Sequence, residues 1–163
     1  MYSSDYSSCN NRIYRIFESN NFNIKSIHFM NYSVKASISS NKNAAVHIKE
    51  SEISFGISPD TEASLPNPAE LFLGSFSACI LKNVARFSVM MNFEYSSAEL
   101  TVNAVRLEKP PRMDEIQYEL LIHSQDESLN IDLLQKNIEK FGTIFNTVKA
   151  CCSVSGIIKK LVD

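Results

Sequence analysis

The sequence predicts an α+β fold, because strand-like and helix-like segments come in blocks instead of alternating regularly. Short alternating apolar segments fill residues 32–57, and one long apolar helix follows at 67–91. Two further strands are expected at 97–108 and 114–124, and helices after them. With only four glycines and no glycine-rich phosphate loop, a dinucleotide-binding fold is not expected. The 163 residues suffice for one domain with a modest core.

The N-terminal third divides into an extension and a strand region. Residues 1–29 are rich in Ser, Asn and Tyr and show no sustained period, so we predict a disordered or loosely packed extension ahead of a domain at 30–163. An ordered arm is the alternative, since its apolar side chains could pack on the domain. Within the domain, alternation with polar residues predicts strands on either side of a turn at 39–43; the alternating residues are Tyr32, Val34, Ala36 and Ile38 before it and Val46 and Ile48 after it. Residues 58–66 are expected to form a loop.

The long helix has a clear start. Asn67 is a good N-cap and Pro68 fits the first helical position. The nearly continuous apolar sequence from residue 71 to 91 predicts a central, buried helix. Asn130 is expected to cap a second helix carrying Leu133, Leu134, Ile138 and Phe141, and a last short helix is expected to start near Cys152 and to carry Ile157, Ile158 and Leu161.

Composition restricts the partners and the compartment. The net charge is −2 and there is no basic cluster, so nucleic acid is not expected as a partner. Lys82 and Arg86 interrupt the apolar helix, which argues against a membrane span, and the absence of a secretory signal pattern favours the cytoplasm. The four cysteines form no CxxC pair and the three histidines do not flank them, so we expect no bound metal or cofactor.

Two cysteines are candidates for thiol chemistry. Cys79 lies inside the central helix, and Lys82, Asn83 and Arg86 share its face. A small buried cysteine without function is the alternative reading of that position. Cys152 is expected at a helix start, where the positive end of the helix dipole would lower its thiol pKa, although an inert packed thiol fits equally well.

Two segments resemble the signatures of the OsmC/Ohr family. The first is Asn67–Cys79, with its proline, acidic residue, small residues and cysteine, and the second is Cys152–Ser155, in which serine replaces the family's proline. The Pro110–Pro111 pair also falls where the family often joins two strands. The resemblance implies an intertwined α+β homodimer with a long central buried helix packed on antiparallel strands. It also implies a thiol peroxidase that reduces organic hydroperoxides, and in some members hydrogen peroxide.

In such an enzyme, Cys79 would attack the peroxide and become a sulfenic acid, and Cys152 would resolve it as a disulfide. An external dithiol, lipoyl groups in the best-known branch, would then reduce the disulfide. We therefore predict that Cys79 and Cys152 can pair. The adjacent Cys151 is a rival or backup resolving thiol.

Two departures from the Ohr branch leave a second function open. By the resemblance, Lys42 stands in for an arginine that in that branch lies beside the reactive thiolate, and it keeps the charge without the planar fork. A solvated turn residue without function is the alternative reading of Lys42. Ala69 occupies the position of the family's partner glutamate, so Glu70 is the nearest acid, and it could serve the helix N-terminus instead. Lys82 or Arg86 could also tune the thiolate. The alternative function is a non-catalytic thiol redox sensor or a small-molecule-binding protein on the same scaffold.

Overall fold

The computed structural model describes residues 30–40 and 44–162 of the chain. The chain divides into two compact units, residues 1–33 and 34–163, and the described residues of the first unit, 30–33, have no regular secondary structure. The predicted extension at 1–29 and the candidate residue Lys42 lie outside the described residues.

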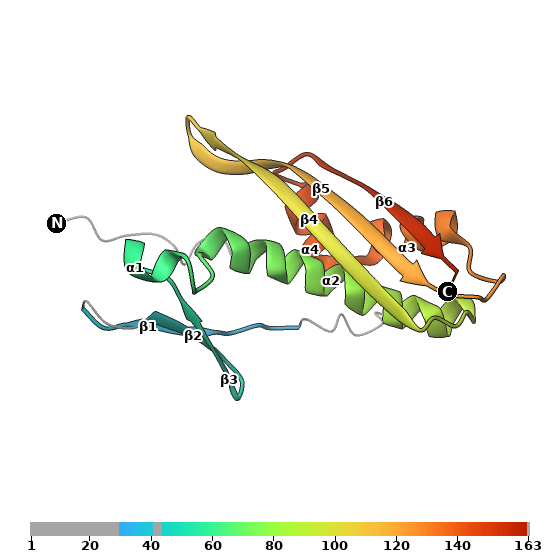
Figure 1. The fold of residues 1–163 in the computed structure, drawn as a ribbon, viewed down its shortest axis with the longest axis horizontal. Coiled ribbons are helices and arrows are strands. Elements are labelled where there is room, and N and C mark those ends of the chain that lie inside the picture. The colour runs from blue at the N-terminus through green and yellow to red at the C-terminus, as the bar shows by residue number, and fades with distance from the viewer. Residues whose placement is uncertain (1–29, 41–43, 163) are drawn as a thin grey trace, which may run out of the picture. The chain divides into compact units, whose positions relative to one another are not determined.

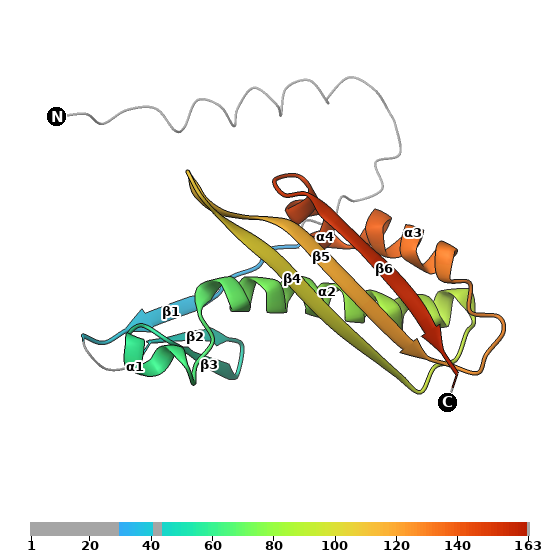
Figure 2. The same cartoon turned by 45° about the horizontal axis from the view of Figure 1, so that its top comes forward.

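The second unit contains two three-stranded sheets. The first is antiparallel in the order β1 (Lys35–Ile38), β2 (Ala44–Ile48), β3 (Ser51–Phe55). The second has the order β4 (Ser97–Glu108), β5 (Pro111–His123), β6 (Val154–Leu161), as Figure 2 shows. β4 and β5 pair antiparallel, whereas β5 and β6 pair parallel. The strands predicted at 32–57, 97–108 and 114–124 are thus confirmed, with β5 beginning at Pro111.

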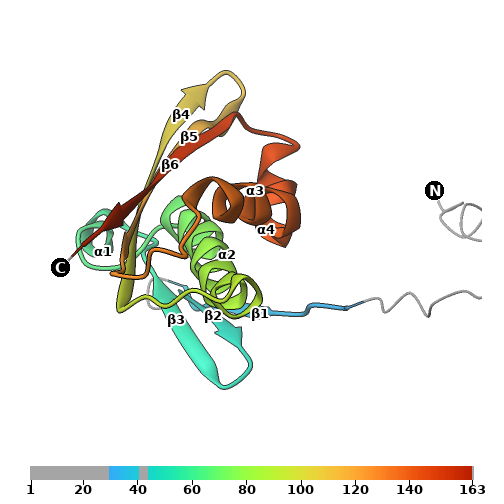
Figure 3. The same ribbon diagram turned by 90° about the vertical axis from the view of Figure 1, so that its right-hand side faces the viewer.

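In the described part of the chain, these sheets are accompanied by four helices: α1 (Pro59–Glu62), α2 (Pro68–Met91), α3 (Ile131–Phe141) and α4 (Thr143–Lys149). α2 runs along the second sheet (Figure 1), and the end-on view shows α2, α3 and α4 on the same face of it (Figure 3). α1 falls in the segment predicted as a loop. The α+β prediction is confirmed.

The start of α2 is fixed by its own sequence. The side-chain oxygen of Asn67 accepts hydrogen bonds from the backbone N–H groups of Ala69 (2.9 Å) and Glu70 (3.0 Å). A carboxylate oxygen of Glu70 accepts the N–H of Asn67 at 2.8 Å in return, which completes a capping box. Together these contacts satisfy N–H groups that the first turn of a helix leaves free. Glu70 therefore serves the helix N-terminus.

The hydrophobic core lies between α2, α3 and α4 and the covered face of the second sheet. α2 contributes Phe76, Ile80, Val84 and Phe87, and the sheet and the other helices contribute Ile116, Tyr118, Leu120, Ile122, Leu134, Ile138, Phe145, Val148 and Ile158. The described residues leave other parts of α2 uncovered: Val89 is 81% exposed and Met90 is 64% exposed. We predicted a helix buried on most sides. Among the described residues, one face of α2 is buried and the rest is partly or fully exposed.

The predicted C-terminal helix is wrong, because residues 154–161 form strand β6. Val154, Gly156 and Ile158 lie on the covered side, between the exposed Ser155, Ile157 and Lys159, which is the two-residue period of a strand. Backbone pairing with β5, from Ile116 opposite Val154 to His123 opposite Leu161, stabilises this strand. β-branched residues pack well on a pleated sheet, so the apolar spacing that suggested a helix was overridden by tertiary pairing.

Candidate functional site

Cys79 lies in the middle of α2 at the edge of its buried face. Its side chain is partly exposed, whereas Phe76 and Ile80 on either side are fully buried. The side-chain amide of Asn83, one turn further on, donates a hydrogen bond to the carbonyl oxygen of Cys79 at 2.8 Å and lies 3.8 Å from its sulfur. The thiol is therefore reachable from solvent and has a neutral N–H donor beside it.

Asn83 itself is held firmly in place. It is 7% exposed and packs at the junction of α3 and α4, where its amide nitrogen would be 3.5 Å from a Cβ on Gly142. A buried amide normally has hydrogen-bond partners, and here the backbone of Cys79 supplies one. The helical spacing of the sequence predicted that Asn83 lies on the same face of the helix as Cys79. It did not predict that Asn83 contacts the sulfur.

The charged candidates on α2 have different surroundings. The guanidinium of Arg86 lies over the rings of Phe87 and Phe141, at 5.4 and 6.0 Å from their centroids. Lys82 is exposed on the helix surface. Glu70 is occupied by the capping box at the helix start. The described side chain beside the thiol is thus Asn83, whose amide nitrogen lies 3.8 Å from the sulfur of Cys79.

Cys152 does not begin a helix. It follows the C-terminal end of α4, and its backbone N–H donates to the carbonyl oxygen of Val148 at 2.9 Å. The nearby helix terminus is thus the negative end of the dipole, opposite to the prediction. Burial raises the pKa of the Cys152 thiol, and the neighbouring Cys151 and the Asp114 carboxylate raise it further, while Arg112 acts in the opposite direction. The predicted lowering of this pKa is therefore wrong.

The sulfur of Cys152 faces the start of β5. Its S–H group donates to the carbonyl oxygen of Met113 at 3.4 Å, and its side chain packs against the hydrophobic core. The sulfur of Cys151 lies 3.7 Å from that of Cys152, and Cys151 is exposed. The two adjacent thiols thus form a pair in which Cys152 is the inner member and Cys151 the outer, exposed one.

A carboxylate that the sequence did not single out fixes this pair. Asp114 accepts hydrogen bonds from the backbone N–H groups of Ser153 (2.8 Å) and Glu115 (2.9 Å) and forms an ion pair with Arg112 at 2.6 Å. These contacts hold the pKa of Asp114 at about 2, the N–H of Ser153 having the largest effect. Glu115 adopts a left-handed backbone conformation with φ of 51°, which is costly for a residue with a side chain. The segment Cys151–Ser153 is therefore fastened to β5 by a polar contact that lies next to a residue in a costly backbone conformation.

Helix α4 links the surroundings of the two cysteines. The rings of Phe76 on α2 and Phe145 on α4 stack with centroids 5.6 Å apart, and both contact Tyr118 on β5. Since Asn83 lies at Gly142 and Phe76 at Phe145, α4 runs antiparallel to α2. The chain leaves α4 towards the N-terminal half of α2 and then reaches Cys151 and Cys152. All three described cysteines are free thiols.

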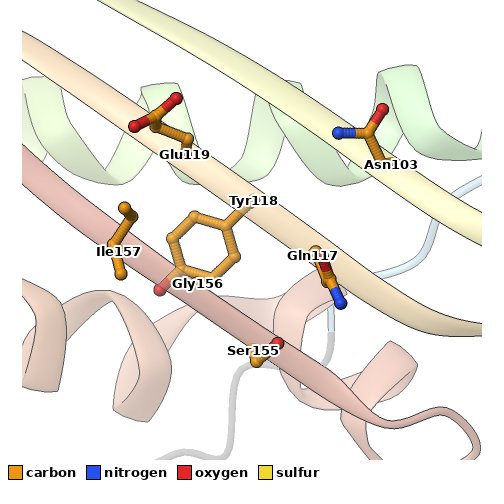
Figure 4. Close-up of a pocket in the computed structure, with 7 residues that line it drawn as sticks. All are labelled: Asn103, Gln117, Tyr118, Glu119, Ser155, Gly156 and Ile157. Carbon is orange, nitrogen blue, oxygen red and sulfur yellow. The ribbon is translucent and has the colours of Figure 1, made fainter.

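A pocket on the second sheet contains none of these groups. It has a volume of about 390 Å³ and is lined by Asn103, Gln117, Tyr118, Glu119, Ser155, Gly156 and Ile157 (Figure 4). No cysteine lines this pocket, so the thiol chemistry lies elsewhere.

Within the described ranges, no three His, Cys, Asp or Glu side chains gather where they could hold a metal ion. None of the helices in the same ranges combines the length and apolarity that crossing a bilayer requires.

Comparisons with known proteins agree on one fold. Residues 59–160 match the model of the family described as OsmC-like protein. The structure is similar to the OsmC-like protein of Mycoplasma pneumoniae (TM-score 0.73, 15% identity, 81% of this chain and 98% of that one). It is also similar to a protein of Aquifex aeolicus (TM-score 0.68, 18% identity, 83% and 99%). A third similar structure is the organic hydroperoxide resistance protein OhrB of Bacillus subtilis (TM-score 0.53, 16% identity, 80% and 98%). The comparison with curated proteins gave no match.

Proposed function

Because the chain belongs to the OsmC-like protein family, we propose that it is a thiol-dependent peroxidase that reduces organic hydroperoxides. The observation that carries the proposal is Cys79, a free, partly exposed thiol on the central helix with the amide of Asn83 beside its sulfur. A thiolate is the nucleophile in peroxide reduction, and an N–H donor beside the sulfur stabilises negative charge there. The name of the Bacillus subtilis protein supports the choice of organic hydroperoxides as substrates.

The proposed cycle uses two cysteines and an external reductant. The Cys79 thiolate attacks the terminal oxygen of the hydroperoxide and the O–O bond breaks, which leaves a sulfenic acid on Cys79. The alkoxide that leaves takes a proton from solvent and becomes an alcohol. The Cys152 thiol condenses with it, forming a disulfide and releasing water. A dithiol, of which lipoyl groups are the expected type, then reduces the disulfide by exchange. Lys42, with Lys82 or Arg86, is proposed to add positive potential at the first thiolate.

Pairing of Cys79 with Cys152 requires movement. Both cysteines are free thiols, with Asn83 beside the first sulfur and Met113 beside the second. A disulfide needs about 2.05 Å between sulfurs, so the two sulfurs have to close up after Cys79 is oxidised. The anchor of the segment carrying Cys152 to β5 is a small number of hydrogen bonds around Asp114, which such a movement can break.

We also propose a homodimer. The uncovered surface of α2 carries exposed apolar residues together with Gly74, where an added Cβ would meet no atom within 4 Å. An apolar helix surface with small residues suits close packing against a second helix, and two α2 helices related by a twofold axis would cover each other.

A peroxide consumption assay tests the proposed enzyme. With tert-butyl hydroperoxide and dihydrolipoamide, we expect many turnovers per chain, none for Cys79→Ser, and a single oxidation without recycling for Cys152→Ser. The Cys79→Ser protein should keep the fold, as circular dichroism can check. If the unaltered protein consumes only one equivalent of peroxide despite excess dithiol, the peroxidase proposal is wrong and a redox sensor on the same scaffold takes its place.

A further inference from the structure

The two adjacent thiols after α4 differ in their access to solvent. Cys152 is partly buried against the core, and its S–H group is directed to Met113. Cys151 is exposed, and its S–H group donates to the carbonyl oxygen of Val148 at 3.3 Å. Their sulfurs are 3.7 Å apart, so each thiol is already in contact with the partner it would need for a bond of about 2.05 Å.

We propose that Cys151 takes over the disulfide from Cys79, so that the oxidising equivalent moves from α2 to an exposed pair formed by Cys151 and Cys152. This inference rests on the proposed peroxidase cycle and adds a third thiol to it. It gives Cys151 a role as an internal reductant of the first disulfide, which differs from resolving the sulfenic acid in place of Cys152.

The step balances as a thiol–disulfide exchange. The Cys151 thiol loses its proton, and its sulfur attacks the Cys152 sulfur of the Cys79–Cys152 disulfide. The new bond joins Cys151 to Cys152, the bond between Cys152 and Cys79 breaks, and Cys79 leaves as a thiolate that can be reprotonated or can react again. No electrons enter or leave the chain, because one disulfide replaces another.

Geometry favours the Cys151–Cys152 disulfide as the bond that the external dithiol reduces. Adjacent Cα atoms are only about 3.8 Å apart across a trans peptide, below the range of about 4.4–6.8 Å that disulfides usually span. A bond between neighbouring cysteines is therefore strained and easily reduced, as exposed and strained disulfides generally are. Because Cys151 is exposed, a bulky dithiol could reach this bond without entering the site around Cys79.

Strain also means that the Cys151–Cys152 disulfide need not predominate at equilibrium. Each time the exchange occurs, Cys79 is released, and further peroxide oxidises it to a sulfenic acid. That second oxidation removes the leaving thiolate and pulls the exchange forward. The relay therefore predicts that one chain consumes more peroxide equivalents without any reductant than a chain that lacks Cys151.

The experiment counts the peroxide equivalents that each chain consumes. All proteins carry Cys9→Ser, so that Cys79, Cys151 and Cys152 are the only thiols, and tert-butyl hydroperoxide is added one equivalent at a time without reductant. The three-thiol chain should consume two equivalents, whereas Cys151→Ser should consume the second at least about tenfold more slowly, since its Cys79 stays in the disulfide. Cys151 is exposed, so serine should be tolerated there.

Mass spectrometry after the second equivalent identifies the bond. In the three-thiol chain we expect the Cys151–Cys152 linkage with Cys79 as a sulfenic acid that dimedone traps, and in Cys151→Ser the Cys79–Cys152 linkage. A three-thiol chain that consumes only one equivalent and keeps Cys79 linked to Cys152 would overturn the relay and leave the peroxidase standing. Formation of the adjacent disulfide at an unchanged rate in Cys79→Ser would also overturn the relay, because peroxide would then oxidise the pair directly. If no chain consumes peroxide, the proposed function fails and the relay fails with it.

Discussion

The two sheets of this protein have the same number of strands but bury their apolar side chains to very different extents. In the second sheet, Ile116, Leu120 and Ile122 are fully buried beneath α2, α3 and α4. In the first sheet, Ile38 is 67% exposed and Ile53 is 37% exposed. A sheet is stable when one face is covered by another layer, and within the described residues the second sheet has such a layer from its own chain. The first sheet is therefore expected to depend on a surface beyond the described residues, as the proposed homodimer would provide.

The largest expected effect comes from matched truncations in the two sheets. Leu120→Ala should lower the free energy of unfolding by about 2–5 kcal/mol, since it leaves a cavity in a closed core. Ile53→Ala should cost less than about 1 kcal/mol in dilute protein, because that side chain is already partly in water. Urea unfolding at several protein concentrations measures both values. A loss for Ile53→Ala that grows with protein concentration would support covering by a second copy, and a loss equal to that of Leu120→Ala at every concentration would contradict the comparison.

A pair of glycine substitutions gives the next largest effect. A Cβ on Gly156 of β6 would lie 2.2 Å from the ring of Tyr118, so Gly156→Ala should destabilise the protein by about 1–3 kcal/mol through overpacking. Gly74→Ala on α2 meets no atom, so it should stabilise the isolated chain by about 0.5–1 kcal/mol through its helix propensity.

The same Gly74→Ala protein tests the dimer, because an added methyl group would separate two helices packed at that glycine. We expect sedimentation to show weaker self-association together with the gain in stability of the dilute chain. Unchanged association would place the interface elsewhere, and a chain that stays monomeric at micromolar concentration before any substitution would contradict the dimer.

The smallest expected effect concerns the acid stability of the second sheet. The folded pKa of Asp114 is about 2, below the value of about 3.9 for an unfolded aspartate, so its carboxylate stabilises the fold at pH values above about 4. This contribution is lost as the pH falls towards 2. Asp114→Asn should therefore lower stability at pH 6 and make less and less difference below pH 4. Unfolding midpoints across this range check the prediction, and a difference that is independent of pH would contradict it.

Local signals in the sequence predicted the helices that begin with a cap and the strands that alternate clearly. Asn67 with Pro68 and Asn130 marked the starts of α2 and α3 correctly. Helix α4 was not predicted, and neither was β6, whose strand conformation depends on pairing with β5. Gly142 separates α3 from α4 and carries no side chain that could mark a helix start.

Those parts of the site that have a local signal in the sequence could be predicted. The cysteines and Asn83 were identified because they stand out locally or share one helix face. Asp114 was not, since its role depends on Ser153, which lies far away in the sequence and comes near only through the parallel pairing of β5 and β6. The prediction for Cys152 was wrong because it assumed a helix starting there. The chain instead forms strand β6, and the helix end near Cys152 is the C-terminal end of α4.

The parallel pairing of β5 and β6 also has a consequence for the order of folding. β4 and β5 follow each other directly and can form a hairpin early, whereas β6 can join only after α3 and α4 have carried the chain back to the same end of the sheet. We therefore expect β6 to dock late, since loop closure has to precede a non-local contact. Until it docks, Cys151 and Cys152 lack their neighbours on β5. A refolding chain would thus expose this thiol pair to chance oxidation at the stage when wrong partners are most accessible, and reducing conditions should improve the yield of native protein.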